Sequence, residues 1–138
     1  MNREPVMPPE AVDTRKTLKE LATALRGLHQ ALVKVTRSEY ERGSEPVNGP
    51  VELLQLLTTH PYFAWLHPLS ALMVEVDEVL DKEPIPPARM QAILTQLRSL
   101  LSQSGDTPSD FCARYLDAIH RDPAAVIAHS AVRRLIAP

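Results

Sequence analysis

The chain has little of what several common classes of protein require. It contains one cysteine, Cys112, in 138 residues, so an intrachain disulfide framework and a thiolate-rich zinc site are both excluded. Fifteen Lys and Arg against 17 Asp and Glu give a net charge of −2, which provides no basic field for binding phosphates. We therefore expect no nucleic acid among its partners.

The sequence also lacks the segments that direct proteins to membranes. The N-terminal residues MNREPVMPPE contain no apolar stretch of the kind found in signal peptides. No uninterrupted apolar run approaches the roughly 20 residues that span a bilayer. These observations predict a cytoplasmic protein with no membrane partner, and a mass of 15.4 kDa fits one domain.

Glycine is scarce, with four residues, and long glycine-free stretches favour helices. The 13 prolines are compatible with helices because most stand where a helix would begin, where the missing N–H costs no hydrogen bond. Asp122-Pro123 and Thr107-Pro108 each place a good N-cap residue before such a proline. No alternating strand pattern occurs, so the expected fold class is all-α.

Hydrophobic periodicity divides the chain into a tail and one domain. Residues 1–12 show no periodicity and are predicted to be a mobile N-terminal tail, whereas residues 13–138 form a single helical domain. The strongest pattern is a leucine seam along a first helix at about residues 14–41, with spacings of three and four residues. Its members are Leu18, Leu21, Leu25, Leu28, Leu32 and Val35.

Further helices are predicted at about residues 50–58, 61–80, 87–104, 108–120 and 123–135. Within residues 61–80, Pro68 removes the hydrogen bond to the carbonyl of Ala64 and should kink the helix. The expected architecture is an antiparallel bundle of about five to six helices with a kinked central helix. Three long helices, at 14–41, 61–80 and 87–104, pack together, and the shorter ones close the bundle.

The segment Glu52–Leu80, ELLQLLTTHPYFAWLHPLSALMVEVDEVL, resembles a family of short bacterial helical proteins known as a domain of unknown function. The similarity extends from the first helix to VIAHSAVRRL at Val126–Leu135. This resemblance implies a helical fold and a bacterial cytosolic setting. It implies no activity, cofactor or catalytic residue.

An aromatic cluster between two His-Pro pairs is the first candidate site. Three of the six aromatic residues lie between residues 60 and 67. One interpretation is a ligand pocket formed by His60, Phe63, Trp65 and His67, with the kink exposing the Ala64 carbonyl. In the other, the aromatic side chains anchor a bent helix in the core and the histidines cap it. We favour the second, because aromatic residues bury large areas and normally serve the core.

Histidine and carboxylate side chains offer a second candidate, a metal or acid–base centre. Asp117 and His120 lie one helical turn apart, and His129 could fold back beside them. A surface Asp–His contact explains the same residues, and the sequence contains neither HExxH nor the Glu-x-x-His pairs of di-iron bundles. Phosphate-binding glycine loops and serine-nucleophile elbows are missing too, so no cofactor is expected.

Surplus apolar surface indicates self-association. Ala24, Gly27 and Ala31 form a stripe of small residues beside the leucine seam, and a mid-helix glycine costs about 0.5–1 kcal/mol relative to alanine. The last helix is apolar nearly all round, and Val132 and Leu135 are its candidate contact residues. Such a helix is covered on several sides, either inside the monomer or by a second copy.

Two further features favour ordinary structural roles. Four acidic residues between positions 77 and 83 crowd a helix C-terminus, where the macrodipole disfavours negative charge. We expect compensation from Lys82 and from an arginine of a neighbouring element such as Arg89, with a bound divalent cation as the alternative. Cys112 is predicted to be buried and inert, because His120 stands at the wrong rotation to activate its thiol.

Together these patterns favour a small non-enzymatic helical module that binds a protein or small-molecule partner and forms a homodimer. The alternative is a metal-dependent or acid–base enzyme that uses histidines and carboxylates of residues 60–67 or of the group Asp117, His120 and His129. Histidines that converge in one pocket would favour the enzyme. A large apolar self-contact with dispersed histidines would favour the module.

Overall fold

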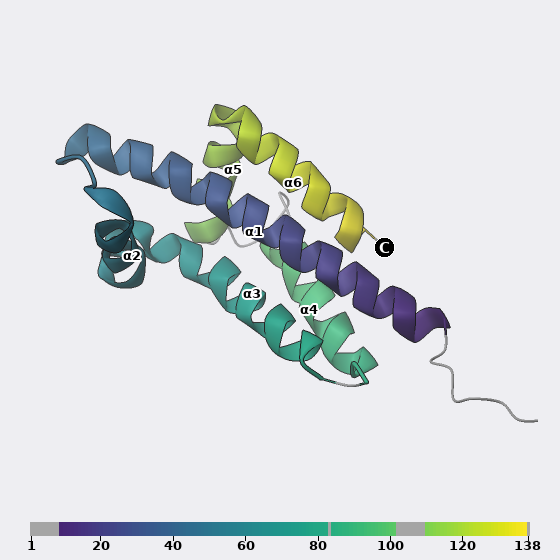
Figure 1. Ribbon diagram of the computed structural model, residues 1–138. Coiled ribbons are helices and arrows are strands. Elements are labelled where there is room, and N and C mark those ends of the chain that lie inside the picture. The colour runs from purple at the N-terminus through teal and green to yellow at the C-terminus, as the bar shows by residue number, and fades with distance from the viewer. Residues whose placement is uncertain (1–8, 83, 102–109, 138) are drawn as a thin grey trace, which may run out of the picture.

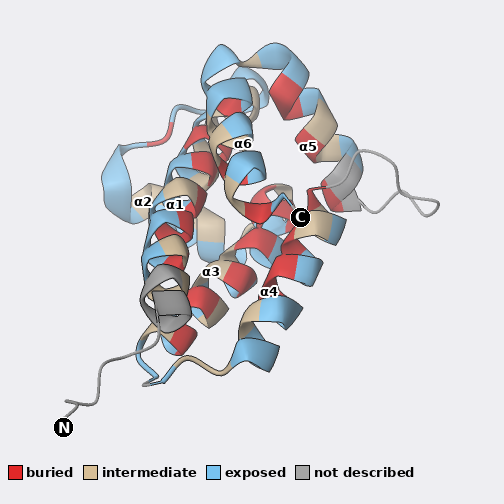
Figure 2. Cartoon of the chain, turned by 90° about the vertical axis from the view of Figure 1, so that its right-hand side faces the viewer, coloured by how far each residue is buried: buried red, intermediate tan, exposed pale blue. Residues whose placement is uncertain are grey.

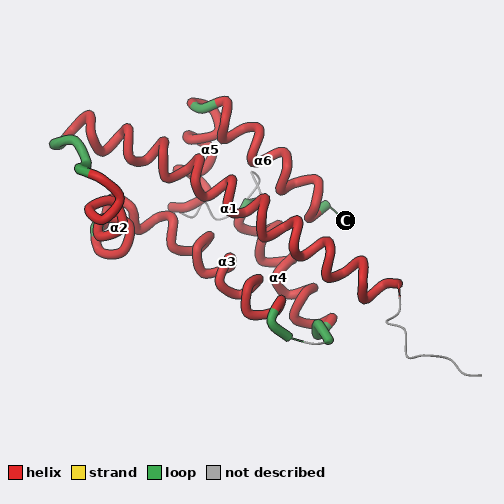
Figure 3. Tube along the Cα trace, viewed as in Figure 1, coloured by secondary structure: helices red, strands yellow, loops and turns green. Residues whose placement is uncertain are grey.

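A computed structural model of the chain describes residues 9–82, 84–101 and 110–137. Within these ranges 88% of the residues are helical, and the elements are six α-helices and one 3-10 helix, with no strand (Figure 3). The predicted all-α fold class is confirmed. Residues 1–8 of the predicted tail, the Thr107-Pro108 pair and the side chain of Cys112 lie outside the described residues.

Helix α1 (Pro9–Gly43) is the longest element, with 35 residues. It begins before the predicted start at residue 14, so residues 9–12 of the expected tail are helical. The leucine seam faces the interior as predicted, and Val35, its last member, is half-buried. The fully buried members are Leu18, Leu21, Leu25, Leu28 and Leu32.

The other elements follow in chain order and pack around α1. They are α2 (Gly49–Thr59), the 3-10 helix η1 (Pro61–Leu66), α3 (His67–Leu80), α4 (Pro87–Leu100), α5 (Asp110–Arg121) and α6 (Pro123–Ile136). In the view of Figure 1, α3 and α6 flank α1 and run antiparallel to it. Figure 2 shows the buried residues of these helices and of α4 turned toward one shared interior.

The partner of α1 in the bundle differs from the prediction. We expected α4 to pack along α1 with α3, but α6 occupies that place and α4 packs against α3 and α6. The reason is the apolar surface of α6, which buries Ala125, Val132 and Ile136. Which helix packs beside another depends on the width of its apolar face rather than on its length.

Proline marks the beginnings of the helices as predicted. A proline stands in the first turn of α2, η1, α3, α4 and α6. Asp122 acts as the N-cap of α6, because its Oδ1 accepts a hydrogen bond from the backbone N–H of Ala124 at 3.1 Å. These starts depend on residues adjacent in sequence, which is why the sequence alone was sufficient to place them.

The predicted break at Pro68 takes the form of a junction between η1 and α3. Because Pro68 has no N–H to offer the carbonyl of Ala64, the backbone N–H of His67 donates to that carbonyl instead. This is the tighter hydrogen-bond pattern of a 3-10 helix. The Ala64 carbonyl therefore has a donor, and the exposed carbonyl of the ligand-pocket interpretation was wrong.

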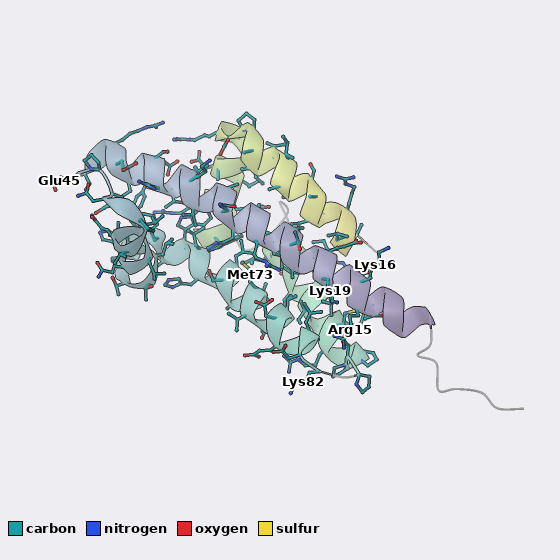
Figure 4. The ribbon with its side chains drawn as sticks, in the orientation of Figure 1. Arg15, Lys16, Lys19, Glu45, Met73 and Lys82 are labelled. Carbon is teal, nitrogen blue, oxygen red and sulfur yellow. The ribbon has the colours of Figure 1, made fainter. Side chains whose placement is uncertain are left out.

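Arginine side chains cap the C-termini of two helices across element boundaries. Arg15 of α1 donates through Nη1 to the carbonyl oxygen of Leu80 at 2.8 Å and through Nη2 to that of Lys82 at 2.6 Å (Figure 4). Arg98 of α4 donates through Nε to the carbonyl oxygen of Ile136 at 2.5 Å. A cation at this end of a helix satisfies orphan carbonyls and opposes the dipole. The arginine that compensates the acidic end of α3 is thus Arg15.

Truncating the leucine seam should remove much of the stability of the fold. Leu25→Ala and Leu28→Ala each delete a fully buried side chain, and the expected loss in free energy of unfolding is about 2–5 kcal/mol. Ile127→Ala is the matched control, because Ile127 is 71% exposed, and it should change stability by less than about 0.5 kcal/mol. Chemical denaturation measures all three variants. Losses below about 1 kcal/mol at both seam positions would contradict the assignment.

Candidate functional site

The four residues of the predicted ligand pocket do not surround one cavity. Phe63 is fully buried in the core, and Trp65, 7% exposed, packs on Phe111 with the ring centroids 5.5 Å apart. His60 caps η1, because its Nδ1 accepts a hydrogen bond from the backbone N–H of Tyr62 at 3.1 Å. These contacts fit the anchoring interpretation of the aromatic cluster.

The fourth residue, His67, joins two elements. Its Nε2 lies 3.0 Å from the carbonyl oxygen of Leu57, so the imidazole ties the end of α2 to the beginning of α3. The side chain is exposed and its ring nitrogen is engaged with backbone. His67 therefore has a positioning role for α2.

The three predicted metal candidates each have a different partner. Asp117 pairs with Arg121 at 3.1 Å, and Nδ1 of His120 lies 2.7 Å from the carbonyl oxygen of Leu116 one turn earlier. His129 contacts neither of them and pairs with a tyrosine. In the part of the chain that the structure describes, no group of three or more His, Cys, Asp or Glu could hold a metal ion. These residues give the metal-enzyme alternative no support.

Two histidines instead form pairs that join helices. Nε2 of His29 lies 3.1 Å from Oγ of Ser70, which links α1 to α3, and Nδ1 of His129 lies 2.5 Å from the hydroxyl of Tyr115, which links α6 to α5. Burial lowers the pKa of His29, and burial together with the charge of Arg133 lowers the pKa of His129. Burial also raises the pKa of Tyr115. Both shifts favour the neutral forms, so the hydroxyl and the imidazole of this pair share one hydrogen bond without a charge.

A cavity of about 290 Å³ lies between α1, η1 and α5. At its border the carboxylate of Glu39 accepts a hydrogen bond from the Tyr62 hydroxyl at 3.2 Å and pairs with Arg121 at 3.3 Å. Burial and the Glu39 carboxylate raise the pKa of Tyr62. The guanidinium of Arg114 lies over the Tyr62 ring, 5.1 Å from its centroid. Of the predicted pocket residues, Trp65 lines this cavity and the others do not.

Helix α2 presents a second candidate surface, which is apolar. The helix contains five large apolar residues, of which none is fully buried and three, Leu53, Leu56 and Leu57, pack partly buried against the core. Val51 is 70% exposed and Leu54 is 64% exposed. Val74, on the outer side of α3, is 55% exposed. Exposed apolar side chains gathered on neighbouring elements are typical of interaction surfaces.

A groove of about 670 Å³ between α3 and α4 provides a concave surface that apolar and polar side chains line together. Pro68, Ala71 and Leu72 contribute from α3, and Leu100 contributes from α4. Both α2 and α3 lie on the side of α1 that is opposite α6 (Figure 1). We use the name charge-poor face for α2, the outer residues Pro68, Ala71 and Val74 of α3, and this groove.

Scarcity of charge marks this face in the sequence. The 29 residues from Pro46 to Val74 include one charged side chain, Glu52, whereas 23% of the whole chain is charged. The stretch Met90–Leu101 contains one as well, Arg98. Hydrophobic periodicity alone missed the face, because it predicts which side of a helix is apolar and not whether the fold covers that side.

Much of the small-residue stripe predicted for dimer contacts is used within one chain. Ala31 is 7% exposed and Val132 is fully buried, while Ala24 and Leu135 are partly buried against the core. Gly27 is exposed, and a Cβ atom there would meet nothing within 4 Å. The close helix packing predicted at Gly27 does not occur within the chain, since neighbouring helices leave open space at that position.

Comparison with known proteins assigns the chain to no family. No protein-family model matches the chain, and no match is found among curated proteins or solved structures. The resemblance to a bacterial family of unknown function, and the cytoplasmic setting, therefore stay predictions. Across the ranges that the structure describes, no helix combines the length and apolar character needed to cross a membrane.

Gly27→Ala should stabilise the protein. Since the position is in mid-helix and a Cβ there has open space around it, the free energy of unfolding should rise by about 0.5–1 kcal/mol. Urea denaturation at two protein concentrations measures the effect. A loss of stability would contradict the exposure of Gly27 and restore the stripe as a close contact with a second copy.

Acid should destabilise the fold through His29 and His129, which are both half-buried. Both pKa values are lowered in the folded state from the ordinary value of 6.5, so below that pH the unfolded chain binds more protons than the folded one. The stability present above pH 6.5 is therefore lost as the pH falls toward the folded pKa values.

The double variant His29→Gln, His129→Gln tests this dependence. Its free energy of unfolding should fall less than that of the unmodified protein between about pH 7 and about pH 5. His120→Gln, at an exposed position, is the control and should leave the pH dependence unchanged. Urea denaturation at each pH gives the free energy of unfolding. If this free energy fell equally with pH in the double variant and in the unmodified protein, the two histidines would not be the cause of the acid sensitivity.

Proposed function

We propose that this protein is a non-enzymatic helical interaction module that forms a homodimer through its charge-poor face. The observation that carries the proposal is the combination of exposed Val51, Leu54 and Val74 with the near absence of charge between Pro46 and Val74. Interface centres are depleted of charged residues because burying an unpaired charge is costly. Surfaces that only face water need no such depletion.

A second copy is the occupant that fits best. Helix α2 packs on η1 and leaves Val51 and Leu54 exposed, so it forms a short apolar ridge, and the groove between α3 and α4 is the complementary hollow. One chain presents both shapes on one side of α1. A two-fold axis would place each α2 in the groove of the other copy and satisfy both surfaces at once.

Charge is compatible with this arrangement. A chain with a net charge of −2 repels its copy, and a nearly uncharged contact keeps this repulsion small. The one carboxylate of α2, Glu52, is already engaged, because it accepts a hydrogen bond from the backbone N–H of Asn48 at 3.1 Å. Glu75 is the one charged residue that lines the groove.

The enzyme alternative has weaker support. His60, His67 and His120 contact backbone groups, and His29 and His129 form separate pairs with hydroxyl groups. Such dispersed histidines offer no shared centre for metal or acid–base chemistry. The dispersal favours the interaction module.

Sedimentation equilibrium at micromolar concentration tests the dimer. The unmodified protein should have twice the monomer mass of 15.4 kDa, and Leu54→Glu should reduce it to the monomer mass by placing a charge in the contact. Ile127→Glu is the matched control, because Ile127 is 71% exposed on α6, across α1 from α3 (Figure 1). It should remain dimeric.

Circular dichroism and urea denaturation test whether both variants stay folded, as we expect for exposed positions. A monomeric mass for the unmodified protein would overturn the proposal. Dissociation by Ile127→Glu but not by Leu54→Glu would move the interface to α6.

A further inference from the structure

The middle of α1 and the whole of α6 carry most of the cations of the chain. Residues 14–38 and 123–136 together hold eight of the 15 Lys and Arg residues but one of the 17 Asp and Glu residues, Glu20. Glu39 and Glu41, which follow in α1, each pair with an arginine. The net charge of −2 therefore combines a basic surface on these two helices with an excess of acidic residues elsewhere.

Four cations of this surface have no partner within the part of the chain that the structure describes. Lys16, Lys19, Lys34 and Arg134 are exposed, and the side chain of none of them forms an ion pair or a hydrogen bond with the described residues. Cations gathered without counter-charges repel one another and leave a positive potential outside the surface. A negatively charged partner would relieve this repulsion.

Helical spacing places these residues on one side of the molecule. Lys16 and Lys34 are 18 residues apart, which is about five turns of an α-helix, so they lie on the same side of α1 and about 27 Å apart along it. In the view of Figure 4, Lys16 lies on the side of α1 toward α6. Lys34 and Ala124 line one groove between α1 and α6. Ile127 and Arg134 follow Ala124 at intervals of three and then seven residues, which keeps them on the same side of α6.

Exposed apolar side chains accompany the cations. Among the described residues outside the charge-poor face, the large apolar side chains that stay exposed are those of Val126, at 41%, and Ile127, at 71%. Both belong to α6, a helix without an acidic residue. A surface that combines lysine and arginine with exposed aliphatic side chains is typical of proteins that bind at the surface of a membrane.

We infer that this surface binds anionic phospholipid bilayers, and we call it the basic face, consisting of Lys16, Lys19 and Lys34 of α1 with Ile127 and Arg134 of α6. The cations lie against the phosphate and carboxylate groups of the lipid headgroups, and Ile127 enters the outer edge of the acyl region. The spread of about 27 Å along α1 fits an extended anionic surface better than a small ligand. The lack of a long apolar run, from which we predicted no membrane partner, concerns spanning segments and not this mode of binding.

Nucleic acid is the other large anionic partner, and the residues favour it less. Residues 14–38 and α6 contain no Phe, Tyr or Trp on which unpaired bases could stack. A duplex presents phosphates and hydrated grooves, which give Ile127 no apolar phase, whereas a bilayer does. The inference is also independent of the proposed dimer, since the basic face shares no residue with the charge-poor face.

Cosedimentation with vesicles tests the inference. The vesicles consist of phosphatidylcholine alone or of phosphatidylcholine mixed with phosphatidylserine. The protein should bind the mixed vesicles at least about tenfold more tightly, because each cation near an anionic bilayer contributes about fivefold to the affinity. Raising sodium chloride from about 0.1 M to about 1 M shortens the Debye length from about 10 Å to about 3 Å, and it should release most of the protein.

Three variants locate the binding surface. The double variant Lys16→Gln, Lys34→Gln should bind the mixed vesicles about 25-fold more weakly than the unmodified protein. Its matched control, Lys82→Gln, Arg89→Gln, removes the same charge at exposed positions where α3 leads into α4. The control should stay within about threefold of the unmodified protein, because charges more than about 10 Å from the bilayer are screened. Ile127→Ser should weaken binding about fivefold by removing the inserted side chain.

Several outcomes would overturn the inference. They are equal binding to the two lipid compositions, an equal loss of affinity in the two double variants, and unchanged binding in Ile127→Ser. Poly-glutamate and a DNA duplex, labelled for fluorescence anisotropy, provide the last: binding to either of them without binding to the mixed vesicles would assign the basic face to a soluble polyanion.

Two measurements without vesicles keep this test separate from folding and from the dimer. Circular dichroism should show the helical spectrum of the unmodified protein in every variant, as we expect for exposed positions. Sedimentation equilibrium should give both double variants the mass of the unmodified protein, whether that mass is of a dimer or of a monomer. Failure of the proposed dimer would therefore leave the result with vesicles unaffected.

Discussion

Burial of the leucine seam of α1 is the interaction on which the other helices depend. An isolated helix gains too little from its own hydrogen bonds to be stable in water, so most of its stability comes from packing an apolar face. In α1 this face is covered by α3 on one side and α6 on the other. Each fully buried leucine contributes about 1.5–3 kcal/mol, and α3 and α6 are held in place by sharing this surface.

Polar contacts at the helix ends then determine how the packed helices are positioned. Apolar packing allows a helix to slide or rotate at small cost, whereas a hydrogen bond has a narrow range of distance and angle. Arg15 places the end of α3 against α1, and Arg98 places the end of α6 against α4. The pair of Tyr115 and His129 holds α5 against α6. These contacts work because cations and donors meet carbonyls that a helix end leaves without partners.

Two surfaces of different character result from this arrangement. The charge-poor face consists of elements whose apolar residues exceed what one chain covers, and it suits the burial of a large area. The cavity beside Trp65 is small and bordered by charged groups that are mostly paired with each other. A large surface of low charge favours a macromolecular partner, whereas the cavity is too small for one.

Features that depend on neighbouring residues were determined by the sequence itself. The spacing of the leucines predicted the buried side of α1, and the prolines with Asp122 predicted where helices begin, because periodicity and capping act over a few residues. The tertiary structure decided which surfaces meet. It placed α6 rather than α4 beside α1, selected Arg15 to cap α3, left Gly27 exposed and brought Trp65 to Arg114. Such pairings join residues far apart in the chain, and they follow from the width and rotation of apolar faces in three dimensions, which local sequence patterns do not contain.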